Sequence, residues 1–215
     1  MNKSIWLAIA FSISLLPVMT SAACKSNLPF HKSDRFEDNL DGTVTDTLTN
    51  LIWLRCPLGQ NWQQTTASCE IPYEHIEGVG SKRMDVHDTW NRAMVETQDF
   101  NFRGGFAGQT DWRVPNIKEL ASISMLHCYP PIDTRIFPDA ASTIGAKQFW
   151  SSTPSRKPAK VQINEDKANP VYEFRSQAWA FSIVDARNAG KALETATSEK
   201  SHVMLVRGSS QPGAR

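Results

Sequence analysis

The sequence lacks a strong excess of either charge and, beyond its first residues, any long apolar run. It carries 23 lysines and arginines against 22 acids, so its formal net charge is +1. Proteins that bind nucleic acid need a basic surface, and this balance gives no support for that class. No later stretch is apolar enough for a membrane helix, so we expect no transmembrane segment in the mature chain.

The chain also lacks the motifs of common metal and catalytic sites. No two of its four cysteines lie at close metal-ligand spacing, which argues against zinc. The acids Asp38, Asp41 and Asp46 do not follow the EF-hand pattern and are typical of turns. His127 adjoins Cys128, but a disulfide-bonded cysteine has no thiolate to act as a nucleophile. We therefore predict no metal, no cofactor and no enzymatic activity.

The N-terminal segment has the pattern of a secretory signal peptide. A cationic start precedes an apolar run from Ile5 to Leu16, and small residues follow. That run is too short to span a bilayer comfortably. We predict a signal peptide over residues 1–22, cleaved near Ala22 or Ala23, and a periplasmic or secreted mature protein.

An exported chain with an even number of cysteines is expected to form disulfides. Four cysteines, Cys24, Cys56, Cys69 and Cys128, follow the signal peptide, and such a set allows three connectivities. Cys56 and Cys69 enclose a short polar loop, so we pair these two, and Cys24 then pairs with Cys128. The alternative is a lipoprotein acylated at Cys24, although Ser21 stands where a bulky aliphatic residue is usual.

The central motif is the stretch from Gly104 to Leu120. Its glycines permit a tight turn. Asn116, followed three residues later by Glu119, is a helix start signal. We predict that one helix ends before the glycines and that a second helix begins near Asn116. The simplest role for Asp111 and Arg113 is an internal ion pair that holds this corner.

The remaining patterns predict short elements joined by loops. Helices are expected from Thr89 and from Asn116 to about His127, a β-hairpin between Asp38 and Leu54 with Val44 inward, and strands at Phe149–Pro154, Gln177–Ile183 and His202–Arg207. Residues 155–169 are expected to form an exposed polar loop, and residues 185–200 a connection between strands.

Several of these segments occur in a characteristic order along the chain. They are Asp41–Asp46, Leu51–Trp53, Trp90, Asp111–Leu120, Phe137-Pro138, Phe149–Thr153, Ala178-Trp179 and Val206–Gly208. Their order resembles that of the DUF1566 family, also called the Legionella collagen-like protein C-terminal (Lcl C-terminal) domain. The resemblance runs from about Arg35 to Gly208, and the loop from Cys56 to Cys69 resembles a cysteine loop seen in many members.

The resemblance implies an α+β fold, a variant of the C-type lectin fold. Two helices would pack on a small, mostly antiparallel sheet stapled by disulfides. We expect one such domain over residues 23–208 and a flexible tail at residues 209–215. Calcium-dependent sugar binding is not implied, because the Glu-Pro-Asn and Trp-Asn-Asp motifs of C-type lectins are missing. We assign structural roles to Asp111, Trp112, Arg113, Trp150, Trp179 and Arg207.

The resemblance and the missing catalytic set favour a binding module of the bacterial cell envelope or surface that recognises a glycan or a protein. The alternative is a periplasmic inhibitor or immunity protein that blocks a toxic enzyme through an exposed loop. An enzyme like the formylglycine-generating relatives of this fold would need reactive cysteines, which have no counterpart here. Two long loops are candidate binding surfaces, since loops carry function on rigid scaffolds. Their candidate residues are Trp62, Tyr73, His75 and Glu77 in the loop from Pro57 to Lys82, and Lys157 and Lys160 in the loop from Ser155 to Asn169.

Overall fold

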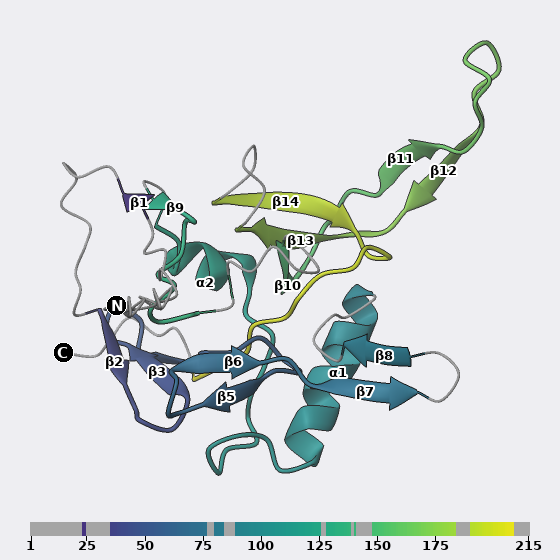
Figure 1. Ribbon diagram of the computed structural model, residues 1–215. Coiled ribbons are helices and arrows are strands. Elements are labelled where there is room, and N and C mark those ends of the chain that lie inside the picture. The colour runs from purple at the N-terminus through teal and green to yellow at the C-terminus, as the bar shows by residue number, and fades with distance from the viewer. Residues whose placement is uncertain are drawn as a thin grey trace, which may run out of the picture.

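The computed structural model describes residues 23–24, 35–76, 80–83, 89–125, 128–138, 140, 148–183 and 190–208. Within these residues the chain forms two short helices and small, mostly antiparallel sheets, and strands predominate (Figure 1). The predicted signal peptide and the tail after Gly208 lie outside the described residues. In the part of the chain that is described, no helix is both long and apolar enough to cross a membrane.

The helices are α1 (Trp90–Phe102) and α2 (Ile117–Ser122). The strands are β1 (Ala23–Cys24), β2 (Phe36–Asp38), β3 (Thr43–Asp46), β4 (Leu51–Leu54), β5 (Asn61–Gln63), β6 (Ser68–Glu70), β7 (Tyr73–Ile76), β8 (Gly80–Arg83), β9 (Cys128–Tyr129), β10 (Gln148–Pro154), β11 (Ala159–Gln162), β12 (Tyr172–Arg175), β13 (Gln177–Ser182), β14 (Lys191–Ala196) and β15 (Val206–Arg207).

Two sheets organise the body. One has the strand order β15-β4-β3-β2 and the other β10-β13-β14, while β5-β6, β7-β8 and β11-β12 are separate hairpins. The predicted hairpin near residue 44 is confirmed, and Val44 and Trp53 are fully buried. They share one core cluster with Leu120 of α2, Phe149 of β10 and Phe181 of β13, so α2 and both sheets bury their apolar faces together.

The segment from Ser201 to Val206 joins the two sheets. We predicted a strand from His202 to Arg207, but only Val206 and Arg207 form one, in β15. The buried residues before them bond to several elements instead: the carbonyl of Leu205 accepts from Leu54, that of Val203 from Leu58, and that of His202 from Trp150. Because its partners change along its length, this buried segment cannot follow one regular ladder.

Both helices begin as the sequence predicts. The hydroxyl of Thr89 caps α1, and Asn116 and Glu119 form a complete capping box at the start of α2. However, α2 ends at Ser122, well before His127, which lies outside the described residues. The amide of Met125 donates to the carbonyl of Pro131, so tertiary hydrogen bonding replaces the next helical turn.

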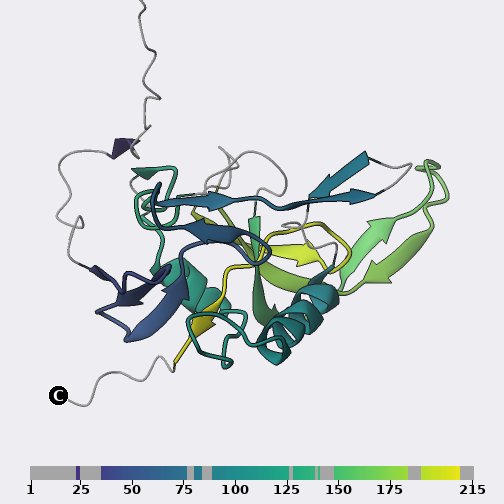
Figure 2. The same ribbon diagram turned by 60° about the horizontal axis from the view of Figure 1, so that its bottom comes forward.

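The chain between β10 and β13 is an ordered hairpin, where we expected a polar loop. β11 and β12 pair antiparallel and extend away from the body (Figure 1, Figure 2). The connection expected over residues 185–200 likewise contains a strand, since β14 pairs with β13 along its whole length. The arm strands β11 and β12, and β14, show only weak alternation of apolar and polar residues in the sequence. Their strand conformation is therefore determined by the strands with which they pair.

Among the described side chains, three of the four predicted cysteines are disulfide-bonded. Cys56 and Cys69 are bonded, with an S–S distance of 2.12 Å, so this predicted pairing is confirmed. Cys128 is also disulfide-bonded, and Cys24 lies directly opposite it in the register of β1 and β9.

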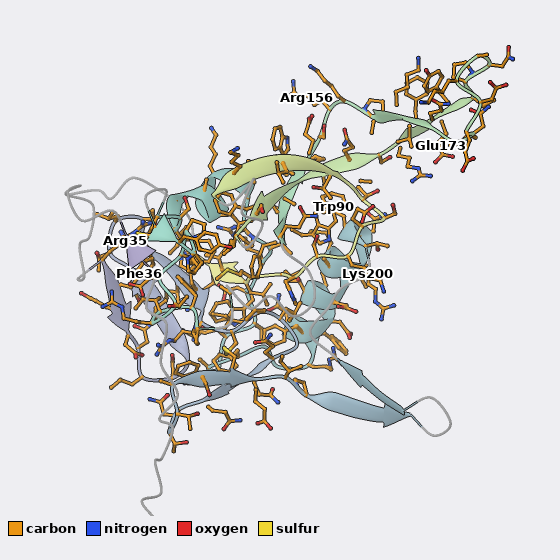
Figure 3. All side chains as sticks on the ribbon, turned by 45° about the horizontal axis from the view of Figure 1, so that its top comes forward. Arg35, Phe36, Trp90, Arg156, Glu173 and Lys200 are labelled. Carbon is orange, nitrogen blue, oxygen red and sulfur yellow. A yellow bond between two sulfur atoms is a disulfide. The ribbon has the colours of Figure 1, made fainter. Side chains whose placement is uncertain are left out.

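A buried ion pair anchors the first sheet. The carboxylate of Asp46 is fully buried and accepts from Nε and Nη2 of Arg35 at 2.8 and 2.6 Å, and from Thr49 Oγ1 at 2.8 Å. Figure 3 shows Arg35 beside this sheet. Burial raises the pKa of Asp46. The hydrogen bonds from Arg35 and Thr49 and the charge of Arg35 together lower the pKa by more than burial raises it, so it lies below its ordinary value.

We expect Asp46 to contribute to acid unfolding. Because its folded-state pKa is lowered, its stabilising effect is complete above the ordinary pKa of 3.8 and is lost as pH falls through the folded value. Denaturant titrations from pH 7 downward should show a steep loss of unfolding free energy in the wild type. Asp46→Asn should be less stable at pH 7 and depend less on pH in this acidic range, and an unchanged slope would contradict the assignment.

Candidate functional site

The central motif turns sharply after α1 and brings Trp112 back against the helix. Gly105 has a φ of +60°, and a Cβ there would meet the carbonyl oxygen of Gln109 at 1.9 Å, so only glycine fits. The side chain of Asn101 donates to the Trp112 carbonyl at 2.6 Å and accepts from its amide at 3.1 Å. The Trp112 indole is 2% exposed and donates to the carbonyl of Phe106.

The charges of this motif form two separate ion pairs, so the expected pair between Asp111 and Arg113 is wrong. Arg113 donates from Nη1 and Nη2 to both carboxylate oxygens of Glu119, each at 2.8 Å, and from Nη2 to the Gly208 carbonyl. Asp111 accepts from Arg207 at 2.7 Å, and this hydrogen bond lowers the pKa of its exposed carboxyl. The amide of Arg113 donates to the carbonyl of Val206, and the amide of Val206 donates to the carbonyl of Arg113. Next to this backbone pair, the side chains of Asp111 and Arg113 bond to different partners.

A groove of about 560 Å³ lies between α1 and this motif. Its charged groups are mutually neutralised, since Arg113 and Glu119 pair within it. The other lining side chains are uncharged, and they mix apolar surface with amide and hydroxyl groups. The lining residues are Met94, Thr97, Gln98, Trp112, Arg113, Val114, Asn116, Glu119, Ser152 and Gly208.

Hydrogen bonds behind the groove hold its walls together. The amide of Ser152 donates to the carbonyl of Pro115, and the amide of Ile117 donates to Thr153 Oγ1 at 3.0 Å. On the other side, the indole of Trp90 donates to the carbonyl of Ser151 at 2.7 Å, which ties α1 to β10. The groove is therefore built on fixed elements.

The residues assigned structural roles lie in or behind these walls. Trp150 is fully buried and belongs to the same core cluster as Trp112. Trp179 is half-buried in β13, and its carbonyl accepts from Ser151 Oγ at 2.6 Å. Arg207 of β15 is the partner of Asp111 at the edge of the motif.

The first predicted binding loop lies apart from the groove. Trp62 of β5 is half-buried, with the guanidinium of Arg55 4.0 Å from its ring centroid and its indole donating to Gln64. Its contacts within the chain are those of a packing residue. The side chains of Tyr73 and His75, on β7, and all of Glu77 lie outside the described residues.

The second predicted loop is the projecting hairpin, which we call the arm and define as residues 155–176. Lys157 is exposed, and the ammonium of Lys160 lies 3.9 Å from the ring centroid of Tyr172. Figure 3 shows Arg156 near the base of the arm and Glu173 along it. The arm also exposes large apolar side chains that are not among the predicted binding residues: Ile163 (53%), Val171 (51%), Tyr172 (43%) and Phe174 (69%).

The two loops that the sequence predicted as binding surfaces are thus separate in the structure. The structure also contains a groove that the sequence did not predict. Of the groove residues, Asn116 and Glu119 were visible in the sequence as a helix start signal. Ser152 was visible only as part of the segment Phe149–Thr153, and Gln98 was not singled out. Among the described residues, no group of three or more His, Cys, Asp or Glu side chains could hold a metal ion.

The family model described as the Lcl C-terminal domain matches residues 42–207. The matched range includes the whole arm and every groove residue except Gly208. No curated protein matches the chain.

Proposed function

We propose that this chain, which belongs to the Lcl C-terminal domain family, is an exported, non-catalytic binding module of the bacterial cell envelope or surface that recognises a glycan or a protein segment. The observation that carries the proposal is the groove beside α1. Its volume of about 560 Å³ falls in the range of ligand-binding clefts.

The chemistry of the groove supports binding without catalysis. Glu119 is the acid that lines it, and this carboxylate is occupied by Arg113 and by the amide of Asn116. A catalytic general acid or base must have a carboxylate oxygen or other proton-transferring atom free to contact the reacting group, whereas the oxygens of Glu119 already accept hydrogen bonds within the chain. The neutralised charges favour an uncharged ligand rich in hydroxyl or amide groups, such as a neutral saccharide or a peptide backbone.

The fold is a variant of the C-type lectin fold, supported by the family match and by two helices on small antiparallel sheets. The mature protein is periplasmic or secreted, supported by the signal-peptide pattern and by the disulfides, which persist in oxidising compartments.

A bulky substitution in the groove tests the proposal. Gln98 is an exposed groove residue, so Gln98→Trp should fill the cleft without disturbing the core. Val95 is exposed on the same helix, and Val95→Trp is the matched control outside the groove. The purified chain would be screened against arrays of neutral and sulfated oligosaccharides and against an envelope extract.

We expect Gln98→Trp to weaken binding to the recovered ligand at least tenfold, or about 1.4 kcal/mol, while Val95→Trp binds like the wild type. Equal binding by both variants would place the ligand elsewhere. Recovery of no ligand from either source would count against the binding role itself.

The alternative function is an inhibitor or immunity protein, and the projecting arm favours it. Enzyme inhibition through the arm predicts stoichiometric loss of activity in one of a panel of bacterial hydrolases. The loss should disappear when residues 156–175 are replaced by a short glycine-serine turn, and persist in Gln98→Trp. Inhibition that survives removal of the arm would exclude this mechanism.

A further inference from the structure

Three polar side chains of the groove come from three different elements and keep hydrogen-bonding groups available. They are Gln98 of α1, Asn116 at the start of α2 and Ser152 of β10, and all three line the groove. Within the described part of the chain, the amide nitrogen of Asn116, the side-chain amide of Gln98 and the hydroxyl of Ser152 have no hydrogen-bond partner. A few polar groups of this kind in a binding cleft fix the orientation of the ligand.

The side-chain amide of Asn116 is held in one orientation. Its oxygen Oδ1 accepts from the backbone amides of Lys118 and Glu119, at 3.0 Å each. Because this oxygen is bonded to the first turn of α2, the nitrogen Nδ2 is the group that remains for a ligand, and it can only donate. The capping box therefore sets the position of a hydrogen-bond donor in the groove.

The charged residues of the groove also present donors rather than acceptors. The side chain of Arg113 is 39% exposed, and its guanidinium has N–H groups beyond those that bond to Glu119 and Gly208. In contrast, both carboxylate oxygens of Glu119 and the carbonyl of Gly208 already accept hydrogen bonds from Arg113. A ligand in this groove must therefore supply acceptors.

This requirement distinguishes a saccharide from a peptide. A peptide backbone carries an N–H donor for each carbonyl of a non-proline residue, and a buried N–H group that finds no acceptor is costly. A neutral saccharide carries hydroxyl and ring oxygens, all of which can accept. Its hydroxyl protons can rotate towards solvent or towards the oxygens of Gln98 and Ser152, so a saccharide leaves fewer groups unpaired.

We propose that the groove binds a neutral saccharide, and that Nδ2 of Asn116 donates to one of its oxygens and determines this specificity. Asn116 then has two roles, since Oδ1 caps α2 and Nδ2 binds the ligand. The half-buried side chain of Met94 provides apolar surface for the C–H groups of the sugar. This inference rests on the proposed groove-binding function, and it names the ligand class and the residue that selects it.

Replacing the Asn116 amide by a carboxylate tests the proposal. Asparagine and aspartate are equally good N-cap residues, so Asn116→Asp should melt close to the wild type, but it puts an acceptor in place of the donor. The mature chain and its variants are probed on arrays of neutral oligosaccharides and of short peptides. Calorimetry then measures the affinity for the best-bound oligosaccharide. We expect Asn116→Asp to weaken this affinity at least tenfold, about 1.4 kcal/mol. Asn116→Ser, an uncharged cap without the amide, should also weaken it.

Thr89 provides the matched control. It caps α1 as Asn116 caps α2, but it does not line the groove, so Thr89→Asp adds the same charge to a helix start and should bind like the wild type. Wild-type affinity in both Asn116 variants, or binding of peptides alone, would overturn the proposal. If Gln98→Trp lost binding while both Asn116 variants kept it, the groove would remain the binding site and only the role of Asn116 would be wrong. Binding to no probe would contradict the groove-binding function as well.

Discussion

Replacing Arg113 by methionine is expected to destabilise the protein by about 3–5 kcal/mol, the cost of leaving a buried charge without its partner. Glu119 is 5% exposed, and its carboxylate receives two hydrogen bonds from Arg113. Methionine keeps much of the aliphatic stem of arginine but removes the guanidinium. The carboxylate then retains the amide of Asn116 as a donor, which cannot neutralise its charge. Chemical denaturation at neutral pH measures the loss.

A second substitution separates charge from packing in this prediction. Glutamine in place of Glu119 can still accept from the Asn116 amide, which preserves the capping box without a charge. The double variant Arg113→Met, Glu119→Gln should therefore recover much of the lost stability. The exposed pair provides a control, because Asp111→Asn removes a surface interaction with Arg207 and should cost about 1 kcal/mol or less. Equal losses from Arg113→Met and Asp111→Asn would contradict the buried-pair interpretation.

Trp112→Ala is expected to cost about 3–5 kcal/mol, as is usual when a large buried aromatic is truncated. Trp112 is packed with Leu54, Val114 and Trp150 in the second core cluster, and it forms part of the groove floor. Its removal would leave a cavity and remove the hydrogen bond from the indole to the carbonyl of Phe106. The expected result is a large drop in the denaturant midpoint together with a loss of groove binding.

Two variants show whether packing is the cause. Trp112→Phe retains most of the buried surface and should cost much less than alanine. Phe102→Ala removes an aromatic from the end of α1 that is 90% exposed, so its effect should stay within about 0.5 kcal/mol. If Trp112→Ala kept the wild-type stability and lost only ligand binding, Trp112 would be a recognition residue and its structural role would be wrong.

Local signals predicted the starts of elements better than their ends. Thr89 and Asn116 start their helices because caps act through neighbouring residues. The end of α2 was not visible, since it depends on a hydrogen bond from Met125 to Pro131 across a loop. The alternation around Val44 predicted a buried hairpin, whereas β14 forms because β13 offers it an edge.

The candidate site was less predictable than the fold. The prediction that Lys157 and Lys160 lie on an exposed segment was correct. The exposed aromatic residues Tyr172 and Phe174 follow the predicted loop, which ended at Asn169, so the prediction did not include them. Trp62 was nominated as a binding residue because aromatics are common at interfaces, yet its ring packs under Arg55 within its own chain. Whether an aromatic side chain is free to bind depends on its neighbours in space.

By itself, the sequence determined the family, the pairing of Cys56 with Cys69, the helix starts and the turn at Gly105, because each depends on residues close together in the chain or on the order of motifs. Only the tertiary structure decided the partners of Asp111 and Arg113 and the groove beside α1. Arg113 bonds to Glu119 and Gly208, and Asp111 to Arg207, because the buried segment ending at Val206 and Arg207 packs against the motif. Gly208 and Arg207 lie 95 and 96 positions along the chain from their partners Arg113 and Asp111, and a local pattern carries no information about such distant partners.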